Sequence, residues 1–389
     1  MRRIYLDHNA TAPPRPAALA ALEAMARRDW ANPASPHQEG RRARELLEGA
    51  RQRVAQALDV SPAAILFTSG GTEAAHAAIR GAAHVRAPGG AGRIVISGLE
   101  HPCVRAAVQA LETRGFHAVL VPPTPQGVID ADRFLRACGP DTAVAALMAA
   151  HNEFGTLQPV DRVAEVLGQR EVPLVVDAVQ AIGRVHPALP RGSHVLGLVS
   201  AHKVGGLAGA GAVVVDPDRS LEPVLGGGEQ ERGRRGGTPP LALLVAMGAA
   251  VEQAGGEAEE CRSLARLRDA FEAALLDGAD GVSIIGKDQA RLPNTSAFLV
   301  DGVLGEDLVA AMDLGGIAVS TGSACSTGSS RPSASLLAMG LDPSRARGLV
   351  RVSLGPGNNE LDVETAAGVA LESIKRLRRY AGITAGERT

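Results

Sequence analysis

Residues 173–180 read PLVVDAVQ, and residues 195–203 read VLGLVSAHK. Each stretch is a short apolar run, rich in β-branched residues, that ends in polar side chains, which is typical of a buried strand followed by a loop. Asp177 ends the first predicted strand, over 173–177, and Lys203 follows the second, over 195–200. The carboxyl ends of strands in an open α/β sheet face the ligand crevice, so we expect both side chains to point toward a bound molecule.

Strands and helices alternate on both sides of this pair. Residues 41–58 have the apolar spacing of an amphipathic helix. Further strands are predicted at 64–68, 93–97, 117–121, 143–148 and 212–215. This alternation predicts an α/β fold with a mostly parallel central sheet covered by helices.

The pattern changes near Gly255. Strands are expected at 283–285, 296–300 and 350–354, with a closing helix over 363–380. At roughly 150 residues per domain, a chain of 389 residues suggests two packed domains. We expect a large domain over 15–255 and a smaller α+β domain formed by 1–14 and 256–389.

Composition excludes several classes of protein. Forty Lys and Arg against 42 Asp and Glu give a net charge of −2, which argues against a dedicated nucleic-acid or membrane-surface binder. Aromatic residues make up only 2% of the chain, too few for base-stacking platforms. No apolar run reaches the roughly 18 residues of a spanning helix. A small-molecule partner is expected, with no direct nucleic acid and no membrane.

The four cysteines are Cys103, Cys138, Cys261 and Cys325, and their spacing fits neither a zinc site nor a disulfide framework. Free thiols in a reducing cytosol are the simplest interpretation, so a cytoplasmic protein without a metal site is predicted. The first three lie in helical patterns and are expected to serve packing. Cys325 lies in the Gly- and Ser-rich stretch STGSACSTGSS, where either an accessible reactive thiol or a small loop residue fits.

Polar residues at the predicted strand ends suggest a phosphate-containing cofactor. The turn TSGGTE, over 68–73, lies between a strand and an alanine-rich helix, and its backbone N–H groups could cradle a phosphate, although a plain capped turn also fits. Asp177 alone could be a helix N-cap. A lysine such as Lys203 can bind an aldehyde covalently when it is desolvated. Together, the acid and the lysine are the pair that a pyridoxal phosphate enzyme needs.

Two other segments carry cationic groups. Arg351 interrupts an alternating strand pattern, where it could point to solvent or bind a substrate carboxylate with its fork of donors. The run GGGEQERGRRGGT, over 226–238, is either a surface loop or a loop that bridges subunits near an anion.

With these motifs in place, nearly the whole chain resembles the cysteine desulfurases, which are pyridoxal phosphate enzymes of fold type I in the aminotransferase class V group. The long cysteine-bearing loop is similar to that of the nitrogen-fixation and iron–sulfur assembly branch. The ordered motifs that carry the resemblance are 4–11 (IYLDHNAT), 32–35 (NPAS), 70–73 (GGTE), 100–102 (EHP), 151–156 (HNEFGT), 177–180 (DAVQ), 200–203 (SAHK), 230–233 (QERG), 292–295 (LPNT), 322–325 (GSAC) and 351–355 (RVSLG).

The resemblance implies a role for each matching residue toward pyridoxal 5'-phosphate. Lys203 would bind the cofactor covalently and shuttle protons, and Asp177 would pair with its pyridine nitrogen. His101 would stack on the ring and assist proton transfer, while Gln180 would hydrogen-bond the phenolic oxygen. The phosphate ligands implied are Gly71, Thr72, Ser200 and His202, joined by Thr238 of the partner subunit in a homodimer.

The resemblance also implies the substrate and the reaction. Asn152 and Arg351 would hold L-cysteine, Arg351 through its carboxylate. Cys325 would attack the substrate sulfur, leaving L-alanine and an enzyme persulfide for transfer to an acceptor protein, either an iron–sulfur scaffold or a thiolation relay. Another class V reaction, such as selenocysteine cleavage or transamination, stays open, as does a sulfur-delivery scaffold without turnover.

Overall fold

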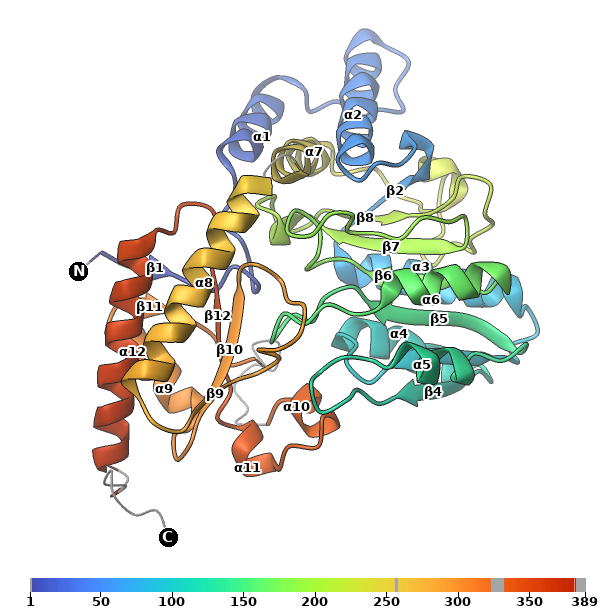
Figure 1. Cartoon of the computed structure of the whole chain (residues 1–389). Helices are drawn as coiled ribbons and strands as arrows, with labels where there is room; N and C mark the ends of the chain where they lie inside the picture. The colour runs from blue at the N-terminus through green and yellow to red at the C-terminus, as the bar shows by residue number, and fades with distance from the viewer. Residues whose placement is uncertain (1, 256–257, 323–331, 381, 383–389) are drawn as a thin grey trace.

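The computed structural model describes residues 2–255, 258–322, 332–380 and 382 (Figure 1). Its largest element is a seven-stranded sheet in the order β2-β8-β7-β6-β5-β3-β4. The strands are β2 (Ile65–Thr68), β3 (Arg93–Ser97), β4 (His117–Val121), β5 (Thr142–Met148), β6 (Leu174–Asp177), β7 (Val195–Ser200) and β8 (Gly211–Val214). Strand β8 runs opposite to the other six strands of this sheet, and the remaining pairs of neighbours are parallel.

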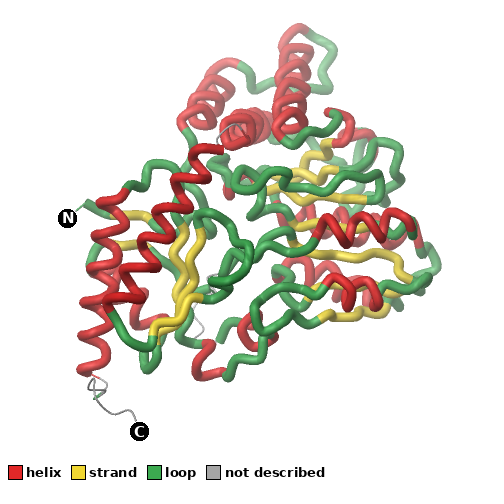
Figure 2. Tube along the Cα trace, in the orientation of Figure 1, coloured by secondary structure: helices red, strands yellow, loops and turns green. Residues whose placement is uncertain are grey.

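Helices cover both faces of this sheet (Figure 2). One face, with Ile94 and Leu198, packs against α3 (Gly71–Arg86) and α4 (Pro102–Glu112). The opposite face, with Val95 and Val199, shares a core with α2 (Gln38–Ala57), α5 (Ala131–Ala137), α6 (Val160–Gln169) and α7 (Leu241–Gly255). Helix α1 (Pro16–Arg28) packs on α7. Successive strand residues therefore alternate between two buried faces, which explains their continuous apolar runs.

A second group of elements is formed mainly by the C-terminal third of the chain. Its three-stranded antiparallel sheet has the order β12-β10-β9, with β9 (Val282–Ile284), β10 (Thr295–Val300) and β12 (Val350–Ser353). Helices α8 (Ala258–Gly278) and α12 (Glu360–Tyr380) pack against each other beside it, together with α9 (Gly305–Leu314) (Figure 1). The short helices α10 (Ala334–Ala338) and α11 (Pro343–Ala346) precede β12.

The first strand of the chain belongs to this second group. Strand β1 (Ile4–Tyr5) pairs in parallel with β11 (Ile317–Ala318). The chain then runs beside β12, because the N–H of Ser353 donates to the carbonyl of Leu6 and the N–H of His8 donates to the carbonyl of Ser353. It leaves this strand at residues 9–11, which lie against the carboxyl ends of β6 and β7 through contacts with Gln180 and Lys203.

The predicted fold class is confirmed, and the predicted strands agree with the observed ones to within one residue at each end. The helix expected over 41–58 begins earlier, at Gln38, because the His37 side chain caps it by accepting a hydrogen bond from the N–H of Gly40. The closing helix likewise begins at Glu360, where the side chain of Asn359 accepts from the N–H of Asp362. Capping by histidine and asparagine extends both helices beyond their apolar periodicity.

One backbone contact fixes the turn before α3. A Cβ on Gly211, at the start of β8, would lie 2.6 Å from the Cα of Gly70 and 2.7 Å from the carbonyl oxygen of Val199. We expect Gly211→Ala to lower the free energy of unfolding by about 1–3 kcal/mol, because backbone must move to admit the methyl group.

Urea unfolding followed by circular dichroism measures this loss. The control is Gly49→Ala in α2, where a Cβ meets nothing within 4 Å. That variant should gain about 0.5–1 kcal/mol from helix propensity. An unfolding midpoint for Gly211→Ala equal to that of the parent would contradict the close approach.

Candidate active site

Two neighbouring strands carry the predicted acid and lysine to one edge of the sheet. Strands β6 and β7 pair in parallel, with Asp177 opposite Leu198, and the 3₁₀ turn η2 (Ala201–Lys203) follows β7 directly. Asp177 is buried, and its Oδ1 accepts a hydrogen bond from the N–H of Val179 at 3.0 Å. Burial raises the pKa of Asp177, while the positive charges of His101 and Lys203 lower it. The three ionisable groups therefore share one electrostatic environment.

His101 is the N-cap of α4 and is held in one tautomer. Its Nδ1 accepts a hydrogen bond from the N–H of Cys103 at 3.2 Å, and the Cys103 Sγ lies 2.9 Å from the same nitrogen. Burial, with the charges of Asp177 and Glu100, raises the pKa of Cys103 to about 12. The thiol thus stays protonated and can donate to Nδ1. Because Nδ1 is an acceptor, the ring proton of neutral His101 lies on Nε2.

Three of the residues predicted to bind phosphate, Gly71, Thr72 and Ser200, lie together at the start of α3. A Cβ built on Gly71 would lie 3.5 Å from the Cβ and 3.9 Å from the Oγ of Ser200, so the end of β7 adjoins the first turn of the helix. His202 follows in η2, and its Nδ1 lies 3.0 Å from the Thr11 hydroxyl. Burial and the charge of Lys203 lower the pKa of His202 to about 4. Thr72 lies in the same first turn.

The loop that carries Thr238 is tied to this turn by an ion pair. Arg235 donates from Nε to Glu73 Oε1 at 2.9 Å, and the same carboxylate accepts the N–H of Ser69 at 2.8 Å. A second, nearly buried pair anchors the loop to α2, because both guanidinium Nη atoms of Arg51 donate to Glu231 at 2.9 and 2.8 Å. Thr238 itself is exposed. Its predicted contact with a second copy of the chain stays a prediction.

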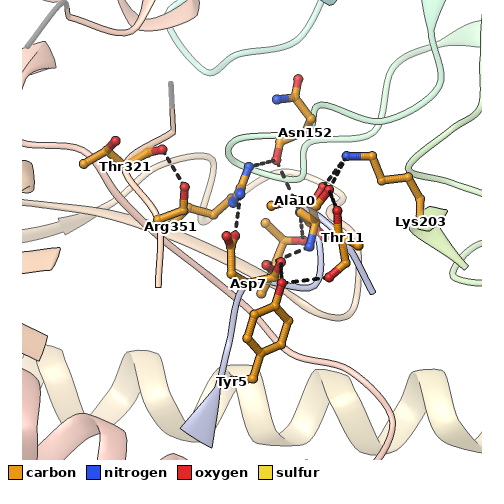
Figure 3. A network of polar contacts seen from close by, with 12 residues as sticks. Tyr5, Asp7, Ala10, Thr11, Asn152, Lys203, Thr321 and Arg351 are labelled. Atoms are coloured by element: carbon orange, nitrogen blue, oxygen red, sulfur yellow. Dashed lines mark hydrogen bonds and ion pairs between the residues drawn. The ribbon is translucent and has the colours of Figure 1, made fainter. Parts of the chain in front are cut away.

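The N-terminal segment, residues 7–11, connects several predicted site residues (Figure 3). The ammonium of Lys203 donates to the carbonyls of Asn9 and Ala10, both at 2.8 Å. Gln180 also donates to the Asn9 carbonyl, at 3.0 Å. Backbone carbonyls give no sequence signal, so residue-type reasoning assigned this segment no role.

Arg351 is buried rather than solvent-exposed, with 2% of its surface accessible. Its Nη2 donates to Asp7 Oδ1 at 2.6 Å, and its Nη1 donates to the backbone carbonyl of Asn152 at 3.0 Å. The side chain of Asn9 donates to that same carbonyl at 3.3 Å. Asn152, Arg351 and the N-terminal segment thus form one hydrogen-bonded unit next to Lys203 (Figure 3).

Arg184 is a further, partly buried cation that the sequence did not single out. It donates to the side-chain and backbone oxygens of Gln180 and, at 3.0 Å, to the carbonyl of Lys203. Burial lowers the pKa of Arg184 to about 10. The only sequence signal was its place four residues after Gln180, in the turn that follows β6. Arg184 fixes the orientation of the Gln180 amide.

Cys325 lies outside the described residues, as does the rest of 323–331. The residues on both sides of that segment contact Glu153. A Cβ on Gly322 would lie 2.9 Å from Glu153 Oε2, and the Ser333 hydroxyl donates to the same oxygen at 2.5 Å. Ser335 contacts the nearby His151, with its Oγ 2.9 Å from Nε2. Both ends of the segment 323–331 therefore adjoin residues that flank Asn152 in the sequence.

The residues present fit pyridoxal phosphate. The first turn of α3 and Ser200 offer small, polar groups at a helix N-terminus, as a phosphate requires. The buried Asp177 carboxylate can pair with a protonated ring nitrogen, and Lys203 is the nearby amine. Within the described ranges, no group of three or more His, Cys, Asp and Glu side chains could hold a metal ion.

Comparison with known proteins identifies the family. The sequence profile of the family "Aminotransferase class-V" matches residues 4–365, and the chain belongs to this family. The chain is 38% identical to an IscS-like cysteine desulfurase of Mycobacterium tuberculosis, over 98% of this chain and 99% of that protein. The resemblance stated from the motifs is therefore confirmed.

Solved structures agree with this assignment. A NifS-like protein superposes with a TM-score of 0.86 at 30% identity, covering 98% of this chain and 100% of that one. A structure of SspA in complex with cysteine gives a TM-score of 0.78 at 30% identity, over 91% and 99% of the two chains. Among the helices of the described residues, none has the length and apolarity needed to cross a membrane.

A second buried carboxyl, that of Glu100, interacts electrostatically with Asp177. Glu100 Oε1 accepts hydrogen bonds from the Ser97 hydroxyl at 2.6 Å and the Met148 N–H at 2.8 Å, whereas Oε2 has no partner in the described structure. Burial, aided by the charge of Asp177, raises the pKa of Glu100 to about 7. In the folded state the protonated form is thus favoured below about pH 7.

This raised pKa predicts a loss of stability at higher pH. The folded state holds the Glu100 proton up to about pH 7, whereas an unfolded glutamate releases it near 4.5. Stability is therefore lost as the pH rises, by about 2–3 kcal/mol between about pH 5 and pH 8. Glu100→Gln keeps the acceptor Oε1 and removes this titration.

Urea unfolding at the two pH values measures the effect. The free energy of unfolding of Glu100→Gln, relative to that of the parent, should be higher at pH 8 than at pH 5. The control is Glu112→Gln at an exposed position, for which the difference from the parent should be the same at the two pH values. A constant difference for Glu100→Gln as well would contradict the raised pKa.

Proposed function

We propose that this protein is a pyridoxal phosphate-dependent cysteine desulfurase. The observation that carries the proposal is the joint attachment of Lys203 and Arg351 to residues 7–11, which puts a cofactor-binding amine and a carboxylate-binding guanidinium in one site. The full-length similarity to cysteine desulfurases supports the choice of reaction. The reaction converts L-cysteine and an enzyme thiol into L-alanine and an enzyme persulfide.

The residues that would hold the cofactor follow from the strand ends. Asp177 would pair with the pyridine nitrogen, Gln180 with the phenolic oxygen, and His101 would stack on the ring. Gly71, Thr72, Ser200 and His202 would bind the phosphate, with Thr238 of the partner subunit. When bound, pyridoxal phosphate supplies an electron sink for bond cleavage next to the amino acid α-carbon. Lys203 would hold it covalently.

Arg351 would bind the α-carboxylate of L-cysteine, with Asn152 beside it. Its guanidinium is buried and already oriented by two hydrogen bonds, so its fork of donors is held ready for a carboxylate. His101 would exchange a proton through Nε2, since Nδ1 is occupied by the N–H of Cys103. Lys203, once released from the cofactor, would return a proton to the substrate carbon.

Cys325 would carry the sulfur. Its thiolate would attack the sulfur of L-cysteine. The carbon–sulfur bond would then break with its electron pair left on the carbon, and protonation of that carbon would yield alanine. The persulfide left on Cys325 is then available to an acceptor protein, such as an iron–sulfur scaffold or a thiolation relay. Such transfer suits a thiol in a Gly- and Ser-rich stretch.

We also propose a domain organisation, an oligomeric state and a cellular location for this protein. The large domain would span 15–255, and the small domain 1–14 with 256–389, since β1, β12 and α12 share an apolar cluster of their own. The exposed position of Thr238 suits a homodimer in which each subunit completes the other's phosphate site. A reducing cytoplasm suits the persulfide chemistry.

Lys203→Ala tests the cofactor assignment. The purified parent should show visible absorbance from the bound cofactor. Sodium borohydride should remove this absorbance and attach the cofactor permanently, because the linkage to Lys203 is reducible. The variant should lose both the band and the attachment, which mass spectrometry of the intact protein detects. A borohydride-fixed cofactor in Lys203→Ala would overturn the role of this lysine.

Cys325→Ser tests the sulfur step separately from cofactor binding. We expect unchanged cofactor absorbance but no persulfide after incubation with L-cysteine, because serine cannot accept sulfur. Alanine and enzyme-bound sulfur are quantified in a single turnover without added thiol, with Cys138→Ser, a buried cysteine, as the matched control. Equal yields of alanine and bound sulfur from Cys325→Ser and the parent would exclude Cys325 as the nucleophile.

A further inference from the structure

The ion pair between Asp7 and Arg351 lies inside the site. The carboxylate is 18% exposed and the guanidinium 3%, and their nearest atoms are 2.6 Å apart. The backbone of both residues is fixed. Asp7 forms a parallel bridge with Ser353, and Arg351 exchanges two backbone hydrogen bonds with Ser320, at 2.7 and 3.1 Å. The pairing is therefore built into the strand register rather than into a mobile surface rotamer.

The guanidinium retains unused donor capacity. Arginine carries five N–H groups, and Asp7 and the Asn152 carbonyl each engage one Nη atom. The Nε of Arg351 is buried and has no partner in the described part of the chain. Each Nη atom also keeps a second N–H group, so a carboxylate could be accepted without displacing Asp7.

We propose that Asp7 is the positioning residue for Arg351 and sets how tightly this arginine binds a carboxylate. This inference rests on the proposed function, because it takes the α-carboxylate of the amino acid as the ligand of Arg351. Asp7 holds the guanidinium in place and balances its charge while no substrate is bound. An incoming carboxylate then meets a guanidinium that is already oriented and whose charge is balanced by Asp7.

The charge balance has a kinetic purpose. A buried guanidinium without a counter-charge is costly and would bind any small anion strongly. Binding the carboxylates of substrate and product equally tightly would only slow the release of alanine, since uniform binding does not lower the barrier of the chemical step. Asp7 weakens this binding while keeping the orientation.

Asp7→Asn separates charge from shape, since the amide oxygen can still accept from Nη2. We expect sulfate to inhibit this variant about tenfold more strongly than the parent, with a lower KM for L-cysteine and a lower kcat. In sodium chloride, the Asp7→Asn holoenzyme should also unfold at a lower temperature than the parent holoenzyme. Sodium sulfate at equal ionic strength should bring its unfolding temperature back toward that of the parent. This thermal readout requires no turnover, so it stands even if the protein is not a desulfurase.

Two further variants make the test specific. Asp7→Asn combined with Arg351→Gln should lose the sulfate effect, because the unbalanced cation is gone. Glu272→Gln removes the negative charge from another buried pair, with Arg291 at 2.7 Å, which involves neither Asp7 nor Arg351. It should lower the unfolding temperature and leave KM unchanged. A raised KM and unchanged sulfate inhibition in Asp7→Asn, as a merely structural role requires, would overturn the proposal, and so would a sulfate effect that survives in the double variant.

Discussion

The docking of residues 4–11 between the two sheets is the constraint on which the candidate site depends. Backbone pairing with β11 and β12 fixes this segment, and its carbonyls then reach Lys203 and Gln180, while Asp7 reaches Arg351. Lys203 follows a strand of the large sheet, and Arg351 lies in the small one. The segment therefore sets the spacing between the groups that would bind the cofactor and the substrate.

Burial dominates the electrostatics of this site. Desolvation raises the pKa values of Asp177, Glu100 and Glu153 and lowers those of His101, His151, His202 and Arg184. Burial thus shifts each of these groups toward its neutral form. A bound phosphate, ring nitrogen and carboxylate would change this balance, since each brings a charge to an oppositely charged partner.

The sequence predicted the strands of the two larger sheets and the residues that follow the strand ends, because both leave local signals, but it did not predict the two-residue strands β1 and β11. Apolar runs on β6 and β7 marked Asp177 and Lys203, and ordered motifs marked Gly71, Ser200 and Arg351. It could not predict what pairs with them. Asp7 and Arg351 are 344 residues apart, and Lys203 is bound by the backbone carbonyls of residues more than 190 positions away. Arg184 and Glu100 act through burial, which no local pattern reports.

The tautomer of His101 illustrates how a main-chain group can hold a chemical property. Its Nδ1 accepts from the N–H of residue 103, at the start of α4, and this contact comes from the main chain, in addition to the Cys103 thiol. The location of the imidazole proton is therefore encoded in the helix start itself and tolerates almost any amino acid at position 103. Proline, which has no N–H, is the one residue that would erase it.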